Sequence, residues 1–278
     1  MGVPVRGAAC WTNEAHRDLF RYSSRPLEVC GAQADPAALS TRVTTHARRG
    51  RKPVGDVRDD FDHVARIAEQ IQADGDGPAE PHERHLLRHV PRPCNVVLEL
   101  GCGTGEFSRR LASIASRVVA VDVSAEMIRV ARNRSAQLSN IEYLVGDMMA
   151  LPLDHAAFDC VVSLNTLHHV DPVQALRAMR TVLRPGGTLL IADVLDRRGA
   201  RSLPINLLAA VVRLARGAML DRGTHRHALR AAYKAHGCGE THPTLTEARA
   251  LAAAELPGAV VRGHLLWRYT AVWRAERR

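Results

Sequence analysis

The stretch VVLELGCGTGEFSRRLA, from Val96 to Ala112, decides the fold of this chain. An apolar run typical of a buried strand ends in three alternating glycines, Gly101, Gly103 and Gly105, and helix-forming residues follow at once. Glycine lets the backbone turn sharply and leaves no Cβ in the way of a ligand, while a helix start offers N–H groups and a positive dipole end to an anionic group. The stretch therefore predicts a strand, a ligand-binding loop and a helix.

Two nucleotide-binding motifs fit this loop poorly. A dinucleotide-binding loop follows the pattern G-x-G-x-x-G/A and places a pyrophosphate at the start of the helix. Here Glu106 stands at the last small position of that pattern, and its carboxylate would repel a phosphate. A P-loop requires Gly-Lys-Ser/Thr after its glycines, and the sequence has no such tripeptide.

Acidic residues near the loop indicate a different ligand. Glu99, two residues before Gly101, adds negative charge where an ammonium group would be welcome, and the loop amides suit a small carboxylate. These features fit the zwitterionic end of an amino acid. Asp122 ends a second apolar strand, Val118 to Val121, where a carboxylate can accept both hydroxyl groups of a ribose. An amino acid joined to a nucleoside points to S-adenosylmethionine as the cofactor.

Four segments, in order along the chain, carry a resemblance to a known family. With them the chain resembles the class I S-adenosylmethionine-dependent methyltransferases, in particular the small-molecule group that includes the quinone-biosynthesis C-methyltransferases. The likeness covers roughly residues 56 to 195 well and the tail more loosely. The segments are ELGCGTG at Glu99 to Gly105, AVDVSAEMI at Ala120 to Ile128, VGDMMALPLDHAAFDCVVSLNTLHHV at Val145 to Val170, and LRPGGTLLIADV at Leu183 to Val194.

The resemblance implies how the polar end of the cofactor is bound. Glu99 and the backbone of Gly101 to Gly105 would hold the methionine portion, and Asp122 would hold the ribose. On its own, Asp122 also fits a helix cap or a solvated acid.

The resemblance implies further roles around the adenine. Asp147 and the amide of Met148 would bind the adenine edge, Met127 would flank the ring, and Asn165 would lie beside the cofactor after the fourth strand. The simpler interpretations are a turn residue for Asp147 and core filler for Met127.

The sequence predicts an α/β fold with a doubly wound sheet. Strand and helix patterns alternate through the centre of the chain, as in a parallel sheet with right-handed crossovers. The carboxyl ends of such strands meet at one edge, so Glu99, Asp122, Asp147 and Asn165 should converge on one crevice. The resemblance implies seven strands, mostly parallel with an antiparallel last strand, and a helical lid or insert. The expected strands are 96–100, 117–122, 141–145, 158–164, 188–194, 260–264 and 268–274, and the expected helices are 105–115, 124–138, 172–183 and 245–255.

Other expected elements flank this core. Helical spacing of apolar residues begins after Asp59, and a second helix is expected over Glu80 to Val90. In the family such helices form part of the lid, so Phe61 and His63 could contact the substrate, although Phe61 fits a core anchor equally well. Pro185-Gly186-Gly187 is expected to form a turn before the fifth strand.

A basic leader, residues 1–55, precedes the methyltransferase domain expected over residues 56–278. The chain has a net charge of +9, and more than half of this excess lies in the leader, which includes the run RRGRK at Arg48 to Lys52. Its composition predicts disorder, with a solvated charge run or a polyanion-binding arm as alternatives. The leader lacks the apolar region of a signal peptide.

The cysteines favour a reducing, cytoplasmic compartment. They show no C-x-x-C pair and no regular spacing, so free thiols are expected rather than a disulfide framework or a zinc site, and no metal is expected. The six are Cys10, Cys30, Cys94, Cys102, Cys160 and Cys238.

Residues 196–243 lie where the family inserts substrate-selecting elements. The apolar segment Pro204 to Leu220 is interrupted by Arg213 and Arg216, and about 20 unbroken apolar residues are needed to span a membrane. No transmembrane segment is therefore expected. A lid helix, the face of a homodimer and contact with a membrane surface remain open.

Methyl transfer needs little from the protein beyond alignment and the exclusion of water. A base is required only when the acceptor must lose a proton, and His168 is the catalytic candidate, with His169 beside it. His168 also fits a pocket-shaping or helix-capping residue. Four histidines of the insert, each expected at the surface, could serve instead: His225, His227, His236 and His242.

The acceptor class is inferred from the segment after the fourth strand. No asparagine-proline-proline-tyrosine-like motif stands there, where the sequence reads NTLH, and this favours a small-molecule acceptor over a nucleic acid. An RNA or protein methyltransferase that docks through the basic leader remains an alternative, as does a non-catalytic protein that binds the cofactor. The accepting atom, O, N or C, is left open.

Overall fold

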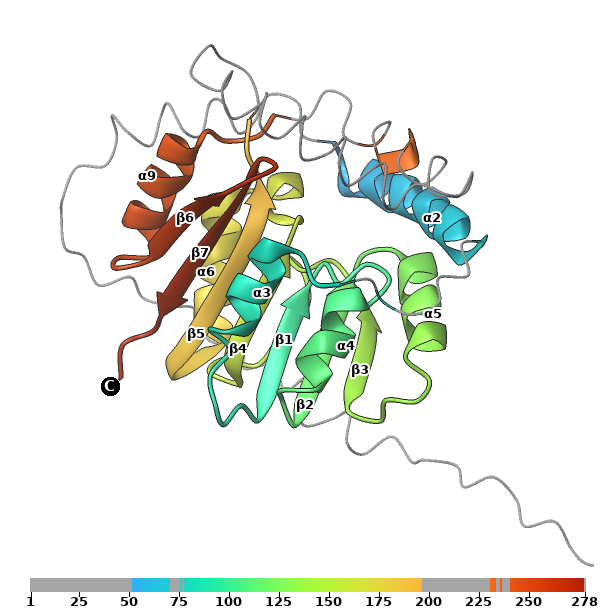
Figure 1. Cartoon of the computed structure of the whole chain (residues 1–278), viewed down its shortest axis with the longest axis horizontal. Coiled ribbons are helices and arrows are strands. Elements are labelled where there is room, and N and C mark those ends of the chain that lie inside the picture. The colour runs from blue at the N-terminus through green and yellow to red at the C-terminus, as the bar shows by residue number, and fades with distance from the viewer. Residues whose placement is uncertain are drawn as a thin grey trace, which may run out of the picture.

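The protein is described as a computed structural model (Figure 1). Most of the expected leader, the segment Pro204 to Leu220, His225 and His227 lie outside the described residues, so the expectations for them stay predictions. The described residues are 52–70, 76, 78–196, 231–233, 236 and 241–277.

A seven-stranded sheet forms the centre of the molecule, in the order β3-β2-β1-β4-β5-β7-β6. All pairs among the first five strands are parallel, whereas β7 runs antiparallel to both β5 and β6. The predicted doubly wound sheet with an antiparallel last strand is confirmed. The strands are β1 (Val96–Leu100), β2 (Arg117–Asp122), β3 (Ile141–Val145), β4 (Phe158–Leu164), β5 (Leu183–Val194), β6 (Val260–His264) and β7 (Arg268–Arg274).

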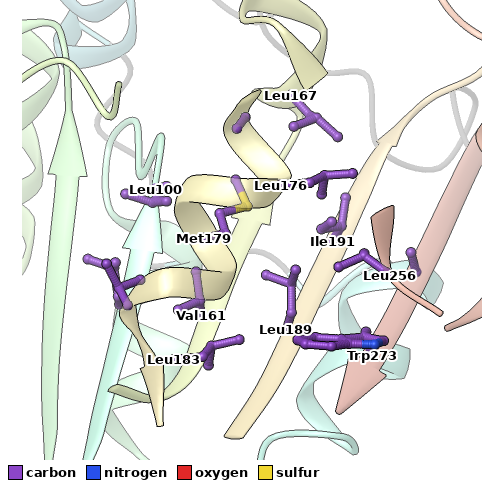
Figure 2. Packing of buried hydrophobic residues seen from close by; sticks show 14 of the residues in the cluster. Leu100, Val161, Leu167, Leu176, Met179, Leu183, Leu189, Ile191, Leu256 and Trp273 are labelled. Carbon is purple, nitrogen blue, oxygen red and sulfur yellow. The ribbon is translucent and has the colours of Figure 1, made fainter. Parts of the chain in front are cut away.

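Helices cover both faces of the sheet because successive strand residues point to opposite sides. Val97 of β1 packs in a cluster with the helices on one face, and its neighbour Leu98 packs in the cluster on the other. Figure 2 shows Leu176 and Met179 of the second face against Leu189 and Ile191 of β5. The first face carries α3 (Pro81–Leu87), α4 (Glu106–Ala112) and α5 (Ala125–Arg134), and the second carries α6 (Pro172–Val182) and α9 (Leu245–Glu255).

The fifth strand is longer than predicted. It begins at Leu183, so Pro185-Gly186-Gly187 lies within β5 and does not form a turn before it. Leu183 pairs with Phe158, and the register then shifts before the regular pairing with β4 resumes at Thr188. Residues beyond β7 account for the difference, because Ala275 donates to the carbonyl of Gly187 and Gly186 donates to that of Glu276.

A further helix, α2 (Val54–Gln70), lies over the carboxyl edge of the parallel strands (Figure 1). Its Val64 and Ala65 pack against Met127 and Val130 of α5. The helix begins at Val54, five residues before the predicted start at Asp59. Both N-terminal helices are therefore present, and α2 is in a position to close one side of a crevice.

The described residues include no helix that is long and apolar enough to cross a membrane.

Candidate active site

The glycine loop after β1 adopts a backbone that only glycine takes easily. Gly101, Gly103 and Gly105 have φ angles of 77°, 53° and 76°. A Cβ on Gly101 would lie 2.0 Å from Oγ1 of Thr166, and one on Gly105 would lie 2.3 Å from the hydroxyl of Tyr143. A Cβ on Gly103 would meet no atom within 4 Å. The packing of Thr166 and Tyr143 thus requires glycine at positions 101 and 105, whereas Gly103 faces open space.

Hydrogen bonds hold this loop against the end of β2. The amides of Gly101 and Cys102 both donate to the carbonyl of Val121, at 2.8 and 3.0 Å. The Gly103 amide donates to Oδ2 of Asp122 at 2.8 Å. Because these three amides already donate to acceptors of the protein, a ligand would contact the surface of the loop more than its N–H groups.

Glu99 is a buried carboxyl on the floor of the loop. It is 1% exposed, and its Oε2 accepts a hydrogen bond from Oγ of Ser108 on α4. Burial, together with the negative charge of Asp122, raises the pKa of Glu99 to about 8. A cation reaching this carboxyl would favour its ionised form.

Asp122 ends β2 and organises the two turns around it. Besides the bond from Gly103, its Oδ1 accepts from the amide of Ser124, the N-cap of α5. Burial raises the pKa of Asp122, and the two backbone hydrogen bonds oppose this shift. Asp122 is not the helix cap, because Ser124 caps α5, and it is not a solvated acid, because it is 8% exposed.

The adenine-side candidates lie after β3 and β4. Asp147 is a turn residue, as its Oδ1 accepts from the amide of Met149, and it also lines the cavity with Met148. Asn165 follows β4 with a φ of 53°, a region that Asn tolerates better than most residues, and its side chain is exposed.

Met127 and Phe61 link the cavity to the helical layer. Met127 is 1% exposed and belongs to the small cluster between α2 and α5, so it is core filler that also lines the cavity. Phe61 packs against this cluster and lines the cavity as well. His63 is exposed and is not among the lining residues.

The described residues outline one cavity of about 1340 Å³ at the carboxyl edge of the sheet. Typical small-molecule sites measure about 300–1000 Å³, so this cavity has room for a nucleoside cofactor and a second ligand. Gly105 is the one predicted site residue outside its lining. The predicted residues that line it are Glu99, Gly101, Gly103, Asp122, Met127, Asp147, Met148, Asn165 and His168.

A histidine and a buried aspartate form a pair at the wall of this cavity. Nδ1 of His168 lies 2.6 Å from Oδ1 of Asp193, at the end of β5, and the His168 amide donates to Oδ2 at 3.0 Å. Burial would raise the pKa of Asp193, but the charge and hydrogen bond of His168 hold it below its ordinary value. The neutral ring therefore carries its proton on Nδ1 and its basic lone pair on Nε2.

Three further histidines line the same cavity: His169, His236 and His242. His242 was expected at the surface, but it is half-buried, with its ring centroid 5.1 Å from that of His168. His169 lies beside His168 with ring centroids 3.9 Å apart, in the short 3-10 helix η1 (Leu167–His169). His236 was expected at the surface, and this is wrong: it is 6% exposed because it packs on Phe61, with ring centroids 4.4 Å apart. Its Nδ1 lies 2.9 Å from Oδ2 of Asp60.

Sequence reasoning missed both aspartates. Asp193 could have been found, because it stands at the carboxyl end of a predicted strand, where ligands gather in such sheets. Asp60 gave no comparable signal, since its histidine partner is 176 residues away in the chain.

The described residues form no metal-binding group, and their cysteine thiols are buried. No group of three or more His, Cys, Asp or Glu there is arranged to hold a metal ion. Cys94, Cys102 and Cys160 are buried free thiols, and burial raises the pKa of each.

Comparisons with known proteins agree with this geometry. The model of a family described as a methyltransferase domain matches residues 98–191. An uncharacterized methyltransferase of Mycobacterium tuberculosis is 34% identical over 190 residues, which are 67% of this chain and 90% of that protein. The ubiquinone biosynthesis O-methyltransferase of Xanthomonas campestris is 32% identical over 55% of this chain and 66% of its own length.

A third relative shares only part of its length with the chain. It is an uncharacterized 37.1 kDa protein in a transposon of Streptomyces fradiae, 42% identical over 37% of this chain. The chain spans 31% of that protein and 66% of the O-methyltransferase, less than two thirds of either.

Solved structures share the fold at low sequence identity. The [4+2]-cyclase SpnF is 18% identical with a TM-score of 0.52, over 83% of this chain and 99% of SpnF. The DhpI–SAH complex is 20% identical with a TM-score of 0.50, over 88% of this chain and all of DhpI. At these identities the likeness establishes the fold and not the reaction.

Two of these comparisons decide the family. They are the Mycobacterium tuberculosis relative, of which the chain covers 90%, and the methyltransferase domain model. The glycine loop, the buried Glu99 and the Asp122 turn provide a cavity that suits an amino acid joined to a nucleoside. The chain belongs to the class I S-adenosylmethionine-dependent methyltransferases, with S-adenosylmethionine as its cofactor.

Proposed function

We propose that this protein transfers a methyl group to the oxygen of a small organic acceptor that carries an acidic hydroxyl, such as a phenol or an enol. The observation that carries the proposal is the His168–Asp193 pair at the wall of the cavity, 2.6 Å between Nδ1 and Oδ1. A base held in this way is needed when the acceptor must lose a proton, and an acidic hydroxyl loses one most easily.

The cofactor roles are part of the proposal. Glu99 would pair with the ammonium group, Asp122 with the ribose hydroxyls, and Asp147 with the amide of Met148 would meet the adenine edge. Met127 would lie against the ring and Asn165 beside the sulfur end. In support, all of these residues line one cavity, and a Cβ on Gly103 would enter its open space.

The chemistry divides between cofactor and protein. S-adenosylmethionine supplies a methyl group on a positively charged sulfur, which is electrophilic without further activation. His168 accepts the hydroxyl proton at Nε2, and the imidazolium so formed is stabilised by Asp193, which is 2% exposed. A phenol has a pKa of about 10 and an ordinary imidazole about 6.5, a gap of about 5 kcal/mol that falls as the oxygen forms its new bond.

A small acceptor fits the room available. The cavity of about 1340 Å³ exceeds a typical single-ligand site, and one relative is named an O-methyltransferase of ubiquinone biosynthesis. The buried free thiols Cys94, Cys102 and Cys160 support a reducing compartment such as the cytoplasm. We therefore propose a small organic molecule, and not a nucleic acid, as the methyl acceptor.

The test compares His168→Asn with the wild type on a panel of phenols, enols, amines and carbon acids, using labelled S-adenosylmethionine. We expect phenols or enols to be methylated and kcat/KM to fall about 100- to 10,000-fold in the variant, with cofactor affinity retained. The matched control is His155→Asn, an exposed turn residue before β4. Methylation of amines or carbon acids alone, or a kcat/KM within threefold of the wild type in His168→Asn, would overturn the proposal.

A further inference from the structure

A cluster of basic side chains lies outside the cavity, and methyl transfer uses none of it. The cluster joins α3, with the two residues that follow it, to β6 at the edge of the sheet. We propose that this cluster binds the phosphate group of a small anion, at a site separate from the active site. Its members, here called the α3–β6 patch, are His85, Arg88, His89, Arg262 and His264.

The fold brings these two segments together although they lie far apart in the sequence. α3 packs on β5 and β7, and β6 is the neighbour of β7. A Cβ on Gly263 of β6 would meet Leu245 of α9, which lies on the second face of the sheet. Because successive strand residues point to opposite faces, Arg262 and His264 point to the first face, beside α3.

Three imidazole rings meet in the patch. The centroid of the His85 ring lies 4.5 Å from that of His89 and 5.4 Å from that of His264. Nδ1 of His89 donates to the carbonyl of His85 at 2.8 Å, and Nε2 of His264 lies 2.8 Å from Oγ1 of Thr270. These bonds orient the rings of His89 and His264 on either side of His85.

The two arginines of the patch have no acidic partner in the described part of the chain. The side chains of Arg88 and Arg262 are exposed, and neither forms a hydrogen bond or an ion pair with a described residue. Other arginines do pair with carboxylates: Arg109 with Asp76, Arg129 with Glu69, and Arg177 with Glu255. The patch therefore presents two guanidinium groups whose N–H donors face solvent.

The electrostatics of the rings show the same lack of negative charge. Burial, followed by the charges of His89 and His264, lowers the pKa of His85 to about 4. Arg262 and Arg88 lower it further. Burial also lowers the pKa of His264, and the charge of Arg262 adds to this shift. A bound anion would supply the missing counter-charge and would favour the imidazolium form of His85.

The charged groups next to the patch do not supply that counter-charge. The acids of α3, Glu80 and Glu83, form a capping box at the start of the helix, and Glu83 lines the cavity 3.9 Å from Arg110. On β7 the nearest charged group is another cation, Arg268, which together with burial lowers the pKa of His82 to about 4.

The donors of the patch fit a phosphate group. Two guanidinium groups and three imidazoles offer N–H donors from two elements, which suits a tetrahedral dianion, whereas one arginine is enough to bind a carboxylate through both oxygens. None of the five residues lines the cavity, so the bound anion is neither the cofactor nor the methyl acceptor. The inference therefore does not depend on the proposed function. Free pyrophosphate and a small organic phosphate present the same chemical group.

Calorimetry at pH 7 and constant ionic strength measures the affinity for two ligands, inorganic pyrophosphate and glycerol phosphate, and the tighter of the two identifies the source of the phosphate group. We expect Arg88→Gln and Arg262→Gln each to weaken binding at least threefold, and the double variant at least tenfold, because each removes charge-assisted hydrogen bonds. Arg249→Gln is the matched control. It changes an exposed arginine of α9, on the other face of the sheet, and should keep the wild-type affinity.

The titration of His85 is a second readout, which a loss of folding would not imitate. The pKa of its ring is measured by NMR in sodium sulfate and in sodium chloride at equal ionic strength, and His85→Gln assigns the signal. Sulfate replaces phosphate here because it stays a dianion over the whole titration. We expect sulfate to raise the pKa of His85 by about one unit or more, and sulfate affinity to rise as the pH falls.

Three results would overturn the site. They are equal affinity of the wild type and the double variant for both phosphate ligands, an unchanged pKa of His85 in sulfate, and a single-stranded DNA that binds far more tightly than pyrophosphate and loses this affinity in the double variant. Failure of the proposed function looks different, because none of these measurements involves methyl transfer. Both single variants should keep kcat/KM and melting temperature close to those of the wild type, since the two side chains are exposed and lie outside the cavity.

Discussion

At the scale of single residues, the carboxyl of Glu99 has a raised pKa. Its pKa of about 8 means that the carboxyl is mostly protonated at neutral pH in the free protein. An ammonium group binds the ionised form, so the proton must leave when the cofactor binds. Below pH 8, affinity should therefore rise with pH.

The prediction is that S-adenosylmethionine binding releases a proton near pH 7 and tightens from pH 6 to pH 8. Calorimetry in two buffers of different ionisation enthalpy measures the release, and Glu99→Gln should abolish both the release and the rise. Heats that do not depend on the buffer would contradict the assignment of Glu99 to the ammonium group.

The three loop glycines should respond differently to alanine. Gly101→Ala places a Cβ 2.0 Å from Thr166 and should destabilise the fold, seen as a lower melting temperature. Gly103→Ala meets open space, so it should cost only the strain of a positive φ, about 1–2 kcal/mol, while cofactor affinity falls at least tenfold.

Gly258→Ala is the control for the second variant, because Gly258 has a φ of 84°, also meets no atom within 4 Å and lies between α9 and β6. It should melt like Gly103→Ala and keep wild-type cofactor affinity. Equal affinity losses in the two variants would show that backbone strain, and not the space above Gly103, explains the effect.

At the scale of secondary structure elements, one serine joins α2 to the sheet. Oγ of Ser124 accepts from the amide of Met127 as the N-cap of α5, and it donates to Oδ1 of Asp62 on α2. The hydroxyl is fully buried, so both bonds form away from water. The position of α2 over the cavity depends in part on this contact.

Ser124→Ala should therefore cost about 2 kcal/mol or more of unfolding free energy, from the lost cap and the lost bond to a carboxylate. Thr244→Ala removes the N-cap of α9 without an inter-helix bond and should cost about 1 kcal/mol. Urea unfolding measures both, and hydrogen exchange should rise over α2 in Ser124→Ala alone. Equal hydrogen exchange over α2 in the two variants would show that the Ser124–Asp62 hydrogen bond does not hold α2 in place.

The elements also show what the sequence could and could not predict. Periodicity and glycine placement predicted β1, β2, β3 and β4 with the bounds that the structure has, because these signals are local. The start of β5 was missed because it depends on Ala275 and Glu276, which pair with a segment about 90 residues away. No local pattern carries such information.

At the scale of the whole molecule, the two halves of the cavity differ in how well the sequence predicts them. The half that we propose for the cofactor is made by strand ends, and the topological rule predicts from the sequence that Glu99, Asp122, Asp147 and Asn165 meet at one edge. The half that we propose for the acceptor is made by segments that meet only in the folded chain, and the contact of His236 with Asp60 was missed for that reason.

Lys52 connects two parts of the cavity wall that lie far apart in the sequence. Just before α2, it donates to Oδ2 of Asp60 on that helix at 2.6 Å and to the carbonyl of His236 at 2.8 Å. Phe61 of α2 and His236 both line the cavity, so loss of this one side chain should loosen both parts of the wall at once.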